Sequence, residues 1–133
     1  MYKCEVASIY DLEREDFWQE GEEVPFGQNP NQRWCVSVCF LINVINEKPK
    51  LLENRKKLYG DEIYALVCSP SFQSKPNGKL YDGKKKLIVM DHFSEEEAES
   101  KINELLAPLV SSTIAGLFEE IEKIFAVEEP PTG

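Results

Sequence analysis

The chain has 133 residues, of which 42% are hydrophobic and 29% are charged, close to the usage of ordinary globular proteins. This length and composition argue against a disordered chain and predict one domain that buries its apolar surface without metals or disulfides. The formal net charge of −9 argues against a general nucleic-acid binder, which would carry a basic surface. We expect the domain to span 1–127, with 128–133 as a flexible tail.

Neither a membrane anchor nor a metal site is indicated by the sequence. No apolar run approaches the roughly 20 residues that a membrane-spanning helix needs, and the N-terminal residues lack a signal-peptide pattern. We therefore expect a cytoplasmic protein. The cysteines form no C-x-x-C pair, and the single histidine, His92, has no metal-ligand spacing to them. We expect apolar core thiols, no metal and no cofactor; the thiols are Cys4, Cys35, Cys39 and Cys68.

Four segments have the composition and periodicity of β-strands. Residues 2–10 alternate between two faces and form the first expected strand. Residues 33–45 form the strongest one, because apolar residues occupy every second position and so share one face. Residues 61–69 and 86–93 supply the other two. The continuous apolar run in the last segment predicts a central position in the sheet.

The segment 11–34, between the first two strands, is both acidic and aromatic. It holds seven carboxylates, and also Phe17, Trp18 and Phe26. Its glycines and prolines predict a loop, with a helical turn near 13–20. A disordered tail would lack such rings, because it has no core for them to enter. The rings therefore either anchor the loop in the fold or meet a partner.

Two helices are expected after the strands. Ser94 and Glu97 form an S-x-x-E capping box, and apolar residues recur at helical spacing as far as Pro108. A second helix is expected from about Thr113, capped by one of the two serines before it. Strands followed by helices are typical of an α+β domain. We expect a single antiparallel sheet of about four strands with two C-terminal helices packed on one face.

Catalytic motifs do not occur in the sequence, and we expect no enzyme. G-x-S-x-G, P-loop and G-x-G-x-x-G patterns are all missing. His92, between a strand end and a helix start, is the residue on which a small enzyme would depend; its other role is to cap or pack at the sheet edge. Lys84, Lys85 and Lys86 near Tyr81 could form a stacking groove for nucleic acid, which the excess of carboxylates argues against.

Four segments, taken in order, resemble one known family. They are QRWCVSVCFLI at 32–42, EIYALVCSPSF at 62–72, KKLIVMDHFSEEEAESKINELLAPL at 85–109 and IAGLFEEIEKIF at 114–125. This order is similar to the immunity protein 8 family, which is found beside polymorphic and contact-dependent inhibition toxins of bacteria. The resemblance covers about 1–127, and its most specific element is Val-Cys-Ser-Pro from Val67 to Pro70; the insert 46–60 is longer and more basic than the family pattern.

The resemblance implies a non-enzymatic protein that binds one cognate toxin domain tightly and neutralises it. Such toxins are often basic nucleases of the RNase or tRNase type, and an acidic inhibitor can occupy a basic substrate cleft. We expect no direct contact with nucleic acid or membrane. The predicted partner-binding residues are Glu15, Asp16, Trp18, Glu20, Glu22 and Glu23 in the acidic segment, and Glu95, Glu96 and Glu99 on the first helix.

Three other functions remain open from the sequence. The first is an acidic nucleic-acid mimic that inhibits another bacterial defence enzyme. The second is a small enzyme that uses His92. The third is a subunit of a larger assembly, which would expose an apolar patch on the sheet face shared by Cys35, Cys39 and Leu41.

Overall fold

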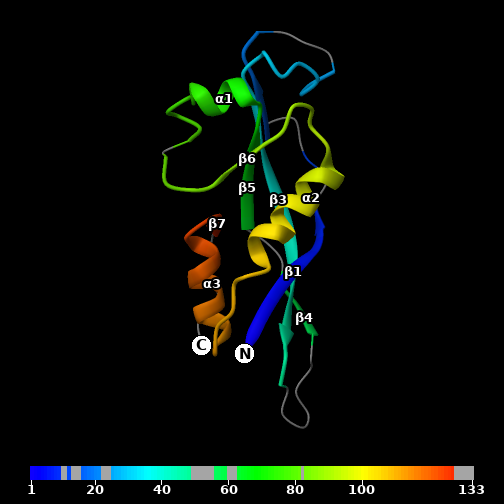
Figure 1. Ribbon diagram of the computed structural model, residues 1–133, viewed down its shortest axis with the longest axis vertical. Helices are drawn as coiled ribbons and strands as arrows, with labels where there is room; N and C mark the ends of the chain where they lie inside the picture. The colour runs from blue at the N-terminus through cyan, green and yellow to red at the C-terminus, as the bar shows by residue number, and fades with distance from the viewer. Residues whose placement is uncertain are drawn as a thin grey trace.

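A computed structural model of the protein describes residues 1–9, 12, 16–21, 25–48, 56–59, 63–81 and 83–127. Within these residues, seven strands form one sheet and three helices pack against it (Figure 1). The strands are β1 (Tyr2–Ile9), β2 (Phe17–Gln19), β3 (Trp34–Asn46), β4 (Lys56–Tyr59), β5 (Ile63–Cys68), β6 (Leu87–Val89) and β7 (Ala126–Val127). The helices are α1 (Pro70–Ser74), α2 (Glu95–Leu106) and α3 (Ile114–Glu122), and none of these is long and apolar enough to cross a membrane.

The long strand β3 organises the sheet. β1 and β2 pair with it antiparallel along one side, and β4 and β5 pair with it antiparallel along the other. β6 adds to β5 in the parallel direction, while β7 pairs with β5 antiparallel. A bulge between Val6 and Ser8 shifts the register of β1 against β3. One strand therefore holds partners that come from distant parts of the chain.

The sheet differs from the predicted one in the number of its strands. All four predicted strands are present, but β2, β4 and β7 join them within the described residues. Each of these three has four residues or fewer, which is too short for a periodic pattern to indicate. In the acidic segment, Phe17–Gln19 form a strand instead of the predicted helical turn, because their backbone pairs with Trp34–Val36 of β3. Asp16 has 3₁₀ geometry, and 13–15 lie outside the described residues. The predicted tail 128–133 lies outside the described residues.

The prediction that the fourth strand is central is wrong. β6 lies at the end of the strand order β1-β3-β5-β6. Its apolar run has another cause, since its two faces enter different clusters. Ile88 packs into the main core, whereas Leu87 and Val89 pack against a smaller cluster on the opposite face. Burial on both faces, and not a central position, makes β6 uniformly apolar.

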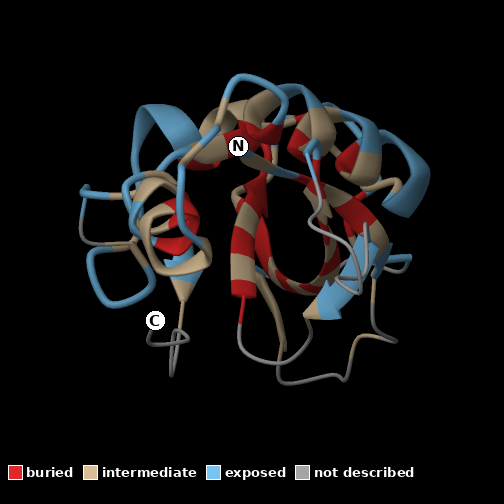
Figure 2. Cartoon of the chain, turned by 90° about the horizontal axis from the view of Figure 1, so that it is seen from below, coloured by how far each residue is buried: buried red, intermediate tan, exposed pale blue. Residues whose placement is uncertain are grey.

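The main core lies between one face of the sheet and the helices α2 and α3 (Figure 2). Alternate residues of β3, from Trp34 to Val44, are buried on this face, as the alternation predicts. The rings of Phe40 and Phe125 meet edge to face with centroids 5.5 Å apart. The helices contribute Ala98, Ile102 and Leu106 from α2 and Leu117, Phe118 and Ile121 from α3.

A smaller core covers part of the opposite face. Cys35 and Cys68 are direct partners in β3 and β5, and both are buried with Phe72 of α1. Trp18 and Tyr81 pack around them. The prediction of two helices on one face therefore holds for α2 and α3, and it misses α1, which has only five residues and lies on the other face.

Candidate interaction surface

The phenylalanines of the acidic segment are anchored inside the fold. Phe17 and Phe26 meet edge to face with ring centroids 4.7 Å apart, and Phe26 packs in the same way against Trp34 at 5.5 Å. Both phenylalanines also approach the ring of Phe93, at 6.2 and 6.4 Å. Gly27 closes this cluster, because its carbonyl accepts a 2.9 Å hydrogen bond from the Phe93 N–H. These rings thus hold the segment on the sheet.

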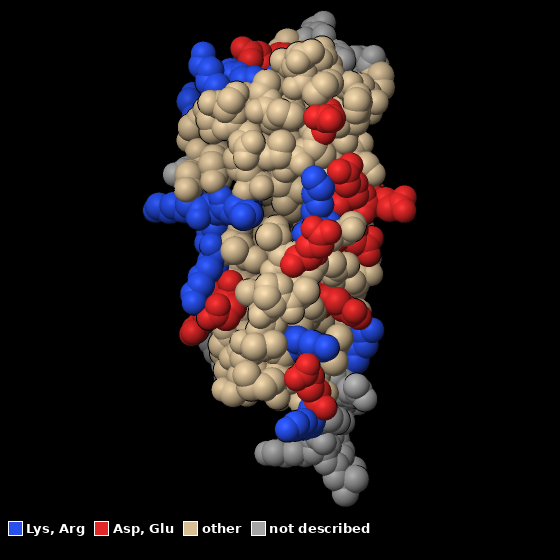
Figure 3. All heavy atoms as spheres, in the orientation of Figure 1, with Lys and Arg blue, Asp and Glu red and all other residues tan. Residues whose placement is uncertain are grey.

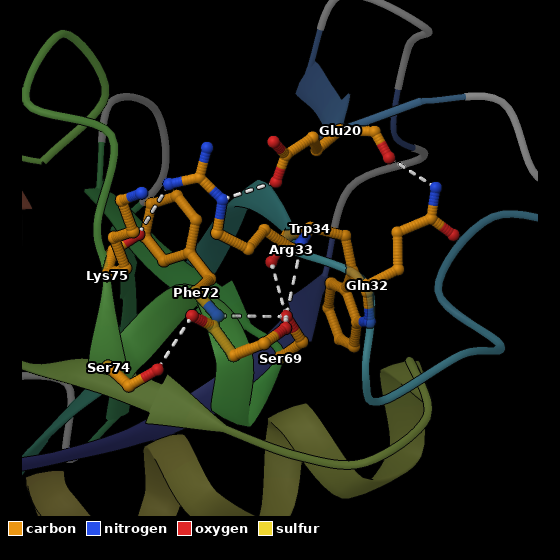
Figure 4. A network of polar contacts seen from close by, with 9 residues as sticks. Glu20, Gln32, Arg33, Trp34, Ser69, Phe72, Ser74 and Lys75 are labelled. Atoms are coloured by element: carbon orange, nitrogen blue, oxygen red, sulfur yellow. Dashed lines mark hydrogen bonds and ion pairs between the residues drawn. The ribbon is translucent and has the colours of Figure 1, made fainter.

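Trp18 and Glu20 lie against Arg33. Figure 4 shows how Arg33 joins Glu20 to Lys75. The Arg33 guanidinium carbon is 5.7 Å from the centroid of the Trp18 ring. Its Nε donates a 2.5 Å hydrogen bond to Glu20 Oε2, and its Nη1 donates a 2.8 Å bond to the carbonyl of Lys75. The hydrogen bond from Arg33 lowers the pKa of the Glu20 carboxyl. The Trp18 ring also meets Phe72 edge to face, with ring centroids 5.8 Å apart.

The predicted contact residues of the acidic segment divide into two groups. Asp16, Trp18 and Glu20 all have contacts within the chain, and the charge of Glu20 is compensated by Arg33. Sequence reasoning missed this compensation, because Arg33 lies thirteen positions after Glu20. The remaining predicted residues, Glu15, Glu22 and Glu23, lie outside the described residues.

The predicted residues of α2 have a different environment. Glu95 and Glu96 are exposed and Glu99 is half-buried. Ser94 caps the helix, since its Oγ accepts a 3.2 Å hydrogen bond from the Glu97 N–H, and the helix dipole favours carboxylates in the first turn. Capping and the helix dipole stabilise this helix start, and of its three first-turn carboxylates only Glu97 forms an ion pair with a described residue.

Carboxylates without a counter-charge gather on α2. Glu97 pairs with Lys101 at 3.5 Å, but within the described ranges Glu95, Glu96 and Glu99 form no ion pair. Figure 3 shows this group over α2 on the right of the molecule. The sequence analysis did not select Glu104, which is exposed eight residues after Glu96, a spacing that keeps both on one broad face of the helix. We call Glu95, Glu96, Glu99 and Glu104 the acidic surface of α2.

Hydrogen bonds fix α2 and the residues that follow it to the outer edge of β1. The Asn103 Oδ1 atom accepts a 2.7 Å bond from the Val6 N–H, next to the bulge in β1. Further along, Tyr2 and Ser111 exchange backbone bonds of 2.7 and 3.0 Å. The buried residues of α2 pack into the main core on one face of the sheet. The acidic surface therefore has a defined position relative to the sheet.

The sheet face opposite the main core is only partly covered. Cys35 is buried there beneath α1, whereas Cys39 and Leu41 further along β3 are half-buried. Leu58 of β4, the partner of Asn43, is 57% exposed. We call Leu41, Ile45 and Leu58 the open sheet face. An apolar contact there would be insensitive to salt.

His92 is exposed at the bend between β6 and α2. The ring cluster at this bend is formed by its neighbour Phe93 and not by the imidazole. Among the described residues, no three His, Cys, Asp or Glu side chains gather closely enough to hold a metal ion.

Comparison with known proteins adds no relative. No family model, no curated protein and no solved structure matches the chain. The resemblance to immunity proteins stays a prediction from the sequence. A functional assignment depends on the residues and surfaces described above.

Proposed function

We propose that the protein is an immunity protein that binds a cognate bacterial toxin domain and neutralises it in the cytoplasm. The observation that carries this proposal is the acidic surface of α2, whose carboxylates form no ion pair with any described residue and stand on a helix fixed to the sheet. A net charge of −9 adds long-range attraction for a basic partner. A basic nuclease is the partner that the sequence resemblance implies, and its substrate cleft would accept carboxylates in place of phosphates.

The free energies involved show that the carboxylates alone would not give tight binding. An exposed ion pair contributes about 0–1 kcal/mol, whereas nanomolar binding requires about 12 kcal/mol. The acidic surface of α2 would therefore raise the association rate and orient the partner, as charged rims of interfaces do. Most of the binding free energy would come from desolvated apolar contacts at the centre of the interface.

The test is binding to the C-terminal domain of the toxin encoded beside this protein. The two proteins are co-purified, and titration calorimetry is run at low and at high salt. We expect nanomolar binding that weakens as salt rises, because salt screens exposed charges. Co-expression should also restore the growth of cells that make the toxin domain. Absence of binding at every salt concentration, together with no rescue of growth, overturns the proposal.

A pair of charge-matched variants locates the interface. The triple variant E95Q/E96Q/E99Q removes three carboxylates from α2, and we expect it to weaken binding by about 10- to 100-fold at low salt. The control E119Q/E120Q/E122Q removes the same charge from α3. Equal weakening in both variants would mean that only net charge matters. Tight binding whose affinity is unchanged by salt and by either variant would refute the role of α2 and favour the open sheet face as the interface.

A further inference from the structure

A cavity of about 360 Å³ lies between β5, the residues that precede β6 and the residues that follow α3. Its lining combines apolar side chains, among them Leu66 and Ile124, with three lysines. The lysines are Lys79, Lys85 and Lys86, and no Asp or Glu among the described residues lines the cavity. Its volume is in the range of sites that bind small molecules.

Contacts within the chain hold the walls of this cavity in place. Tyr81 packs into the smaller core, and its hydroxyl donates a hydrogen bond to the carbonyl of Lys85. The Lys86 N–H donates a 2.9 Å bond to the carbonyl of Ile124. The Lys85 ammonium donates to the carbonyl of Glu122, at the end of α3. The lysine-bearing segment is thus tied to both the sheet and α3, so the cavity does not need a ligand to form it.

Within the part of the chain that the structure describes, no carboxylate neutralises the charge of the lining. Lys79 and Lys86 are exposed and form no ion pair with any residue that the structure describes. The hydrogen bond of Lys85 goes to a neutral carbonyl and cancels no charge. Three lysines thus share one lining with apolar side chains, and their like charge would attract an anion. In a chain of net charge −9, such a cluster is a local reversal of sign.

We propose that this cavity binds a small organic anion, which carries an apolar ring or short chain and one carboxylate, sulfonate or phosphate group. The apolar part packs against Leu66 and Ile124, and the anionic group accepts hydrogen bonds from Lys79 and Lys86. Nucleic acid fits less well, because the net charge of −9 repels a polyanion and Tyr81 is packed in part against the smaller core. The proposal is independent of toxin binding, because none of the lining residues belongs to α2.

The test uses 8-anilinonaphthalene-1-sulfonate, an aromatic sulfonate whose fluorescence rises when it leaves water. We expect saturable binding of one dye per chain. The double variant K79S/K86S should weaken it at least tenfold, while the control K48S/K57S, with the same loss of charge outside the cavity, should change it less than threefold. A126W places a bulky ring at a lining position that is exposed, and it should block the dye with all lysines present.

Competition with the dye shows whether the cavity needs both the anionic group and the apolar part of a ligand. Benzoate and adenosine monophosphate each join an anionic group to a ring, and inorganic phosphate has no apolar part. Displacement of the dye by either organic anion at concentrations where phosphate does not compete supports the proposal and indicates which anionic group is preferred. Equal competition by phosphate would overturn the requirement for an apolar part. Equal weakening by both lysine variants, or dye binding unaffected by A126W in a chain with native circular dichroism, would overturn the site itself.

Discussion

Ser69 connects three elements through one buried hydroxyl, and its replacement by alanine is the sharpest test of the packing. The side chain is fully buried, and its Oγ accepts hydrogen bonds from the Trp34 N–H at 3.1 Å and the Phe72 N–H at 3.2 Å (Figure 4). Ser69→Ala leaves two buried N–H groups without an acceptor and removes the N-cap of α1. An unsatisfied buried donor costs about 1–3 kcal/mol and a lost cap about 1 kcal/mol. Since the two losses overlap at Phe72, we expect a total loss of about 2–4 kcal/mol.

The measurement is urea unfolding followed by circular dichroism, with a thermal scan beside it. At about 4 °C per kcal/mol for a domain of this size, the melting temperature should fall by about 8–16 °C. Ser74→Ala is the matched control, because its exposed hydroxyl donates a 3.0 Å bond to the carbonyl of Ser71, and the loss should stay below about 0.5 kcal/mol. If Ser69→Ala unfolded at the urea concentration of the wild type, or if both variants lost equal stability, the role given to Ser69 would be refuted.

Two further predictions concern the backbone and the buried thiols. Gly27→Ala should cost about 1–3 kcal/mol in urea unfolding, because φ is +73° and a Cβ would lie 2.7 Å from Phe93 Cβ; Gly78→Ala, with nothing within 4 Å, should be neutral or slightly stabilising, and equal effects would contradict the reasoning. Burial raises the pKa of the Cys35 and Cys68 thiols from 9.0 to about 12. Folding therefore favours the protonated thiols. Their contribution to the free energy of unfolding is full below pH 9. It is lost as pH rises toward 12, at about 1.4 kcal/mol per pH unit for each thiol. Between pH 9 and 11, the free energy of unfolding measured in urea should fall less steeply for C35A/C68A than for the wild type. Equal slopes against pH in the two proteins would contradict the prediction.

Regular elements could be predicted because their signals are local. The alternation in β3 and the helical spacing in α2 depend only on neighbouring residues, and Ser94 caps α2 as expected. The cap of α3 is Thr113 itself, and not one of the two preceding serines, because its hydroxyl accepts a 2.9 Å bond from the Gly116 N–H. Boundaries of this kind change by one residue when several capping side chains compete.

The candidate sites were harder to predict from the sequence, because a sequence shows which residues are charged but not which of them form ion pairs. The acidic segment and α2 look alike in the sequence, yet Glu20 is paired with Arg33 while Glu95 and Glu96 have no ion pair among the described residues. The lysine run before β6 looked like an ordinary solvated loop or a nucleic-acid groove. Only the contact with Ile124 shows that it forms one wall of a cavity.

The sequence by itself determined the four main strands, the two long helices, the apolar face of β3 and the excess of negative charge. Tertiary structure decided the rest: the short strands β2, β4 and β7, the position of β6 at the end of the sheet, and which charges are paired. The physical reason is the range of the interactions. Periodicity and capping act over about one helical turn or strand repeat, whereas strand order, ion pairing and cavities depend on backbone and side-chain contacts between residues far apart in the chain.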